Sequence, residues 1–158
     1  MSKLSKSAQR VQAALEEHGL SLSVVELPNS TRTAVEAAQA VNCQVGQIVK
    51  SLIFESIESH QAVLILTSGS NRVNEKAISE ITGEAINRAS ASFVREKTGF
   101  AIGGVAPIGH KEKPLTYIDE DLLTYEEIWA AAGTPNAVFK LTPEQLRQAT
   151  QGKVISVL

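Results

Sequence analysis

Two β-branched apolar runs in the chain most constrain its fold. They are IVKSLIFES at residues 48–56 and QAVLILTS at residues 61–68. Val, Ile and Phe pack well on a pleated, buried surface, and the polar residues between the runs are typical of a turn. The sequence therefore predicts a hairpin of two well-buried strands at the centre of a sheet.

Helical patterns and further strand-like runs are interspersed on both sides of this hairpin. Capping residues such as Thr33 with Glu36, and stop residues such as Gly83 and Gly99, mark helix ends. Some strands are joined by short turns and others by helices, which predicts an α/β mixed (α+β) fold with a mixed sheet. We expect helices at residues 5–18, 34–41, 74–82, 90–98, 125–133 and 142–150, and strands at 21–27, 115–123, 136–141 and 153–158.

The length and charge of the chain limit the number of domains and the kinds of partner. At 158 residues, with 43% hydrophobic and 20% charged residues, the sequence predicts a single globular domain over residues 1–158. The formal net charge of -2 excludes a protein that coats nucleic acid by bulk charge. Any contact with nucleic acid is expected to be local.

Cysteine usage and hydropathy bear on the compartment. The single cysteine, Cys43, forms no internal disulfide, which fits a reducing cytoplasm. The longest purely apolar run, Ala62 to Leu66, is far too short to cross a bilayer, and the N-terminus has no secretory h-region. We expect a cytoplasmic protein without a membrane partner.

An unusual stretch, KTGFAIGGVAPIGHK at residues 97–111, combines adjacent glycines with a proline inside an apolar run. Gly103 and Gly104 leave the backbone bare, so that peptide N–H groups can approach an anion or a carbonyl oxygen. The alternative is structural: the glycines form a tight bend and Pro107 stiffens a turn. The pattern is not a dinucleotide fingerprint or a P-loop, which disfavours a nucleotide cofactor.

Lys50 is the second unusual residue. In an extended chain it shares a face with Leu52 and Phe54, where an ammonium is costly to bury without a partner. A functional role is one interpretation. The other is that Lys50 extends its amine to water from the end of the strand.

Other chemistries have less support in the sequence. His18, His60 and His110 are scattered and form no metal-binding motif, so no metal is expected. No serine or cysteine lies in a nucleophile signature, and no cofactor is expected. The basic residues near the glycine stretch suit a phosphate-bearing substrate or, equally, a solvated surface; they are Arg88, Arg95, Lys97, Lys111 and Lys113.

The segments IVKSLIF, TGFAIGGVAPIGHK and TYIDEDL, taken together, resemble the YbaK/ProX family of aminoacyl-tRNA deacylases, which is related to the editing domain of bacterial prolyl-tRNA synthetases. The resemblance covers the chain from about Leu20 onward. Its most specific elements are the GxxxP loop from Gly103 to Pro107 and the upstream strand with Lys50. It implies a curled, mixed, largely antiparallel sheet or barrel flanked by helices.

The resemblance also implies a trans-editing hydrolase that cleaves the ester of a mischarged tRNA. On that basis Lys50 anchors the 3′ acceptor end, and the backbone from Gly103 through Gly104 to Pro107 holds the aminoacyl ester. No covalent nucleophile, cofactor or metal is implied. An aminoacyl-tRNA synthetase is a further possible partner.

Specificity is expected to reside in loop residues near this site. The candidate substrate-binding residues are Thr31, Arg32, Thr33, Ser68, Asn71, His110 and Asp119. Caps and turns are an equally ordinary use of such residue types. Asp119 orients Lys50 or the ligand, or pairs with a surface lysine.

Two other functions stay open at the level of sequence. One is a non-catalytic tRNA or nucleotide-binding module associated with a synthetase. The other is hydrolysis of a different nucleotide-linked ester, such as an aminoacyl-adenylate. The sequence does not identify the amino acid and the tRNA that are recognised, or the oligomeric state.

Overall fold

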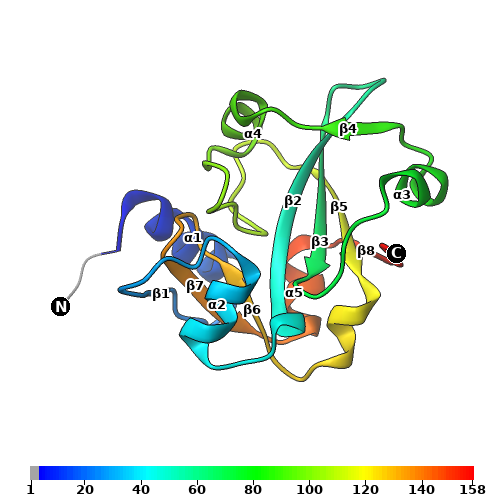
Figure 1. Cartoon of the computed structure of the whole chain (residues 1–158). Coiled ribbons are helices and arrows are strands. Elements are labelled where there is room, and N and C mark those ends of the chain that lie inside the picture. The colour runs from blue at the N-terminus through cyan, green and yellow to red at the C-terminus, as the bar shows by residue number, and fades with distance from the viewer. Residues whose placement is uncertain (1–3) are drawn as a thin grey trace.

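The central hairpin is the organising element of the computed structural model, which describes residues 4–158 (Figure 1). Strand β2 (Ile48–Ser56) pairs antiparallel with β3 (Ala62–Ser68), as predicted. Every residue of β3 is buried. The hairpin therefore lies inside the molecule and supports both faces of the sheet.

The sheet extends outward from this hairpin in the order β1-β7-β6-β2-β3-β5-β8, and β4 pairs with the far end of β2. Four strand pairs are antiparallel (β1–β7, β2–β3, β2–β4 and β6–β7), and three are parallel (β2–β6, β3–β5 and β5–β8). This confirms the mixed, mostly antiparallel α+β fold. The remaining strands are β1 (Val25–Glu26), β4 (Ile86–Arg88), β5 (Leu115–Asp119), β6 (Ile128–Ala131), β7 (Ala137–Leu141) and β8 (Lys153–Ile155).

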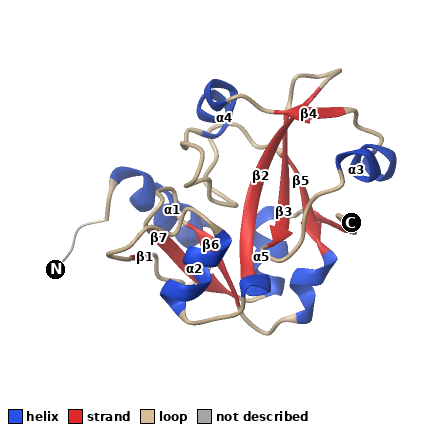
Figure 2. Ribbon diagram, viewed as in Figure 1, coloured by secondary structure: helices blue, strands red, loops and turns tan. Residues whose placement is uncertain are grey.

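Five α-helices surround the sheet within the described residues, and loops join them to the strands, the long loop between α4 and β5 among them (Figure 2). Their ends are set by local signals that the sequence shows. Thr33 and Glu36 form a complete capping box, while Gly83 and Gly99 adopt the left-handed conformation just past two helices. The helices are α1 (Lys6–Glu17), α2 (Ala34–Val41), α3 (Glu75–Thr82), α4 (Ala91–Thr98) and α5 (Pro143–Thr150), with short 3₁₀ helices η1 (Val45–Gln47) and η2 (Glu120–Thr124).

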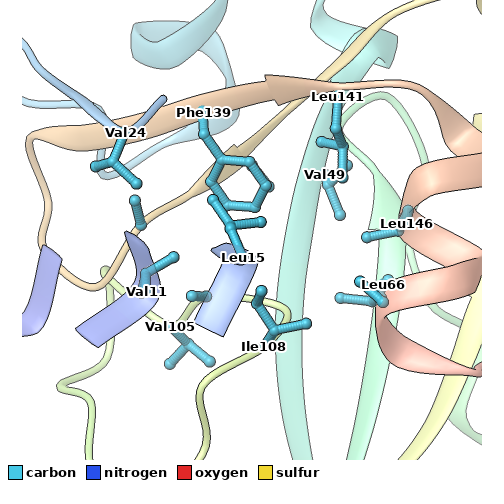
Figure 3. Packing of buried hydrophobic residues seen from close by; sticks show 14 of the residues in the cluster. Val11, Leu15, Val24, Val49, Leu66, Val105, Ile108, Phe139, Leu141 and Leu146 are labelled. Atoms are coloured by element: carbon cyan, nitrogen blue, oxygen red, sulfur yellow. The ribbon is translucent and has the colours of Figure 1, made fainter. Parts of the chain in front are cut away.

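The hydrophobic core lies on both faces of the hairpin. On one face, Val11 and Leu15 of α1 point toward Phe139 of β7, with Leu66 and Leu146 in the same cluster (Figure 3). On the other face, a smaller cluster contains Phe54, Val63, Ile65 and Ile78. Because side chains alternate along a strand, neighbouring residues of β2 face these two different clusters.

The helix predicted at residues 125–133 is wrong. This segment contains strand β6, which pairs with both β2 and β7. Its inward residues Ile128, Ala130 and Ala132 alternate along the chain, but two of them are alanines, so the alternation resembled a helical alanine run. Pairing on both sides outweighed the local helix propensity.

Several strand boundaries also differ from those predicted. The expected strand at residues 21–27 is paired only at Val25–Glu26, and that at 115–123 ends at Asp119, where η2 begins. The short strand β4 was not predicted at all. Within residues 4–158, no helix has the length and apolar character needed to cross a membrane.

Candidate functional site

A cavity of about 730 Å³ opens beside the middle of β2. Its walls come from the residues before α2, the segment after β3, the loop after α4, and strands β6 and β7. Lys50, Arg32 and Gly103 are among the lining residues. Elements far apart in the sequence thus converge on the strand that carries the lysine.

Lys50 is held inside this cavity and does not extend freely into water. Its Nζ donates a hydrogen bond to the carbonyl oxygen of Asn71 at 2.6 Å. Burial lowers the pKa of Lys50 below the ordinary 10.5, and nearby Arg72 lowers it further, whereas Asp119 acts in the opposite direction. The ammonium is therefore fixed in the wall of the cavity by one hydrogen bond and can donate further ones.

A buried carboxylate organises the segment that receives Lys50. Asp119, only 1% exposed, accepts hydrogen bonds from the backbone N–H of Ser68 and from Nδ2 of Asn71, each at 2.9 Å. Asn71 Nδ2 also donates to Asp121 at 2.7 Å. Ser68 uses its hydroxyl to donate to Gly46. Ser68, Asn71 and Asp119 therefore position the support of Lys50 and do not themselves line the cavity.

The glycine stretch forms a turn whose glycines serve different purposes. Gly103 has a φ of +97° and lines the cavity, with the aliphatic part of Arg32 packed over it. Gly104 does not line the cavity: a Cβ there would lie 2.8 Å from the backbone of Thr134. Gly104 thus permits close packing of two loops, which is the structural interpretation considered for this stretch.

Replacing Gly104 with alanine is expected to destabilise the protein by about 1–3 kcal/mol, because backbone atoms of Thr134 cannot rotate away from the new methyl group. Thermal unfolding would measure this as a lower Tm. Ala101→Ser, at an exposed position of the same turn, is the control and should leave the Tm unchanged. Equal Tm values for the two variants would contradict the close packing.

The residues before α2 form the part of the wall next to the glycine turn, since Arg32 packs over Gly103. Thr31 and Thr33 line the cavity, but their hydroxyls already have partners: Thr31 donates to Pro135, and Thr33 caps α2 by accepting from Glu36. Arg32 also lines the cavity. Arg32 is therefore the best placed of these three side chains for contact with a ligand.

His110 and Pro107 lie elsewhere. Both line a separate cavity of about 220 Å³. His110 Nε2 donates to the carbonyl of Ala106 at 2.5 Å, and burial lowers its pKa, so the ring is neutral at pH 7. Because the carbonyl only accepts, the proton resides on Nε2. The structure does not bring His110 and Pro107 into contact with the large cavity.

The cationic lining of the large cavity differs from the basic cluster that the sequence indicated. It contains Arg32, Lys50, Arg72 and Arg88 with one carboxylate, Glu75, which pairs with Arg88 at 3.4 Å. Of the basic residues expected near the glycine stretch, only Arg88 lines this cavity. Lys97 instead pairs with Glu112. Arg72 was not predicted from the sequence, where its only signal is a place shortly after the buried strand that ends at Ser68.

Comparison with known proteins decides the family. The model of the aminoacyl-tRNA editing domain matches residues 28–149, which include the cavity walls from Thr31 to Val138. The protein belongs to the aminoacyl-tRNA editing domain family. Membership makes it an editing hydrolase that acts on the ester of an aminoacyl-tRNA, as the resemblance implied.

Individual relatives of this editing-domain protein agree with the family. The uncharacterised protein YwhH of Bacillus subtilis is 32% identical over 131 residues, 83% of each chain. EbsC of Enterococcus faecalis, a candidate Cys-tRNA(Pro)/Cys-tRNA(Cys) deacylase, is 24% identical and covers 79% of this chain and 76% of its own. The crystal structure of a candidate trans-editing enzyme for prolyl-tRNA synthetase is 52% identical, with a TM-score of 0.93 and 98% of both chains covered.

Proposed function

We propose that the large cavity beside β2 is the site where the editing domain holds the aminoacylated 3′ end of a mischarged tRNA for hydrolysis. The observation that carries this proposal is the convergence of the half-buried Lys50 and the backbone at Gly103 on one cavity. Its volume, about 730 Å³, lies in the range of small-ligand sites. An aminoacyl-adenosine is a ligand of that class.

Each wall of the cavity has a distinct part in this proposal. Lys50 binds a phosphate or ribose oxygen of the terminal adenosine, since an ammonium is a strong charge-assisted donor. The backbone at Gly103 and Val105 lies along the ester and polarises its carbonyl. An attacking water or a substrate hydroxyl completes the reaction. Catalysis then rests on positioning and electrostatics, without a covalent intermediate.

Asp119, Asn71 and Ser68 act on the substrate only through Lys50. Their hydrogen bonds fix the carbonyl that holds the lysine. We place His110, Pro107 and Gly104 outside contact with the ester, in supporting positions around the turn. A prolyl-tRNA synthetase is the synthetase we propose as a partner, and the cytoplasm, where its substrate is made, as the location.

A panel of mischarged tRNAs tests the proposal. tRNA(Pro) carrying alanine, cysteine, serine or threonine would be incubated with the protein, and loss of the ester would be followed over time. We expect faster loss than in buffer for at least one member. Tight binding without any ester loss would instead identify a non-catalytic tRNA-binding module, and preference for aminoacyl-adenylates a different ester hydrolase.

The cationic lining of the large cavity predicts that tRNA binding depends on salt concentration. Arg72 is exposed, lines the cavity and lies near enough to Lys50 to lower its pKa. Arg72→Gln is expected to weaken binding and to reduce the slope of log K against log salt by about 0.7 to 1, as for one phosphate contact.

Arg95→Gln is the matched control for this experiment, because Arg95 is exposed on α4 and does not line the cavity. Its slope should equal that of the wild type. A larger loss of slope at Arg95 than at Arg72 would place the tRNA backbone on the other basic region.

A further inference from the structure

Strand β2 has an open edge inside the large cavity. On the side away from β3, it pairs with β6 only at Ile48 and Val49, and with β4 only from Phe54 to Ser56. Among the described residues, no strand pairs with residues 50–53 on that side. All four residues line the cavity, so the gap in the sheet is part of its wall.

The ladder with β3 shows which peptide groups face this gap. Gly69 N–H donates to Ile48 at one end, and Ser56 N–H donates to Gln61 at the other. An antiparallel ladder alternates between residues that bond to the partner and residues that face away. Even-numbered residues of β2 therefore bond to β3, and the peptide N–H and C=O of Ser51 face the gap.

The side chain of Ser51 is also without a partner. Its Oγ is buried and makes no hydrogen bond within the described residues. Buried hydroxyls are normally paired, and an orphan one destabilises the fold. Ser51 therefore carries an unpaired, buried hydroxyl next to a peptide group that faces the gap.

Ser51 lies on the same side of the hairpin as the glycine turn. It is opposite Leu66 in the ladder, and Leu66 belongs to the same cluster as Val105 and Val94. Lys50 points to the opposite face, where it is paired with Thr67. A ligand that crosses the open edge thus meets Lys50 on one side and Ser51 with the Gly103–Val105 wall on the other.

We propose that Ser51 binds the α-amino group of the aminoacyl ester, as an ammonium, through its carbonyl oxygen and Oγ. This inference rests on the proposed function and adds the group of the substrate that is recognised. An ammonium has three donors and no acceptor, so it can bind two oxygen acceptors of one residue. The apolar chamber around them, which includes Ile53, Val94 and Val105, then receives the amino-acid side chain.

The test uses a stable amide probe, 3′-deoxy-3′-(alanylamino)adenosine, and its Nα-acetyl derivative, which has no ammonium. We expect acetylation to weaken binding to the wild type about tenfold or more, the effect of losing a charged hydrogen bond. Ser51→Ala should weaken binding of the free amine by roughly tenfold and of the acetylated probe by less than about twofold. Titration calorimetry measures all four dissociation constants.

The Tm of Ser51→Ala distinguishes a binding role from a structural one. A structural role of the hydroxyl would lower the Tm of the variant. Because Ser51→Ala removes an orphan buried hydroxyl, its Tm should equal or exceed that of the wild type. Ser79→Ala on α3, outside the cavity, controls for loss of a serine hydroxyl and should bind both probes like the wild type.

Several results would overturn the inference. They are equal binding of the two probes to the wild type, no binding of the free amine, or an equal loss for both probes in Ser51→Ala. The wild-type comparison stands even if the variant does not fold. Failure of ester hydrolysis across the tRNA panel would reject the proposed function alone, since probe binding is measured without hydrolysis.

Discussion

Replacing Lys50 with methionine is expected to lower kcat/KM for ester hydrolysis by roughly a hundredfold or more, the scale of losing a positioned charged donor. Methionine keeps most of the aliphatic stem but removes the ammonium that donates to Asn71 at 2.6 Å. The loss should be measured on the best tRNA of the panel. Residual hydrolysis would reflect the backbone wall at Gly103.

The same variant should not lose stability. The pKa of Lys50 is lowered in the folded protein by burial and Arg72, so the folded state binds this proton less tightly than the unfolded chain. The charged lysine therefore opposes folding fully at pH 7, and this cost disappears only as the pH rises from the lowered pKa to above 10.5. Lys50→Met should consequently have a Tm at pH 7 no lower than the wild type.

Lys97→Met is the control for a lost ammonium, since Lys97 lies on α4 outside the cavity. It should retain wild-type kcat/KM. Wild-type activity in Lys50→Met would remove Lys50 from the mechanism. A large drop in Tm together with the loss of activity would make Lys50 a structural residue.

Truncating Asp119 to alanine is expected to lower the free energy of unfolding by about 3 kcal/mol. The variant leaves three donors that now hydrogen-bond to the carboxylate without an acceptor. These are the backbone N–H groups of Ser68 and Asp121 and the side-chain amide of Asn71, each at 2.9 Å. For a chain of 158 residues this corresponds to a Tm lower by roughly 6–12 °C. Calorimetry would measure both quantities.

Activity should fall as well in Asp119→Ala, since the segment that holds Lys50 loses its anchor. Glu120→Ala, at the exposed neighbour, is the control and should change neither stability nor hydrolysis. A stable but inactive Asp119→Ala variant would contradict the structural part of this account and point to direct contact between Asp119 and the substrate.

Local signals made much of the fold predictable from the sequence. The two central strands have an apolar content that fits only burial, and helix ends at Thr33, Gly83 and Gly99 are set by chemistry within a few residues. The helix predicted at residues 125–133 was wrong because the conformation of this segment depends on pairing with β2 and β7, and β2 lies far away in the sequence.

The candidate site was less predictable for a related reason. Lys50 and Gly103 stand out because a charge and a bare backbone are costly in an apolar run. No feature of the neighbouring sequence distinguishes Arg72 as part of the cationic lining of the cavity, or Gly104 as the residue that contacts Thr134. The open edge at Ser51 arises from where β6 and β4 stop pairing, which only the assembled sheet shows.

The most direct test of the account is to map the amide probe onto the protein by NMR. Titration of 3′-deoxy-3′-(alanylamino)adenosine should shift the backbone signals of Ser51, Gly103 and Val105, which line the large cavity. Shifts confined to Ile108, Gly109 and His110, at the smaller cavity, would contradict the assignment of the large cavity as the site that holds the aminoacyl ester.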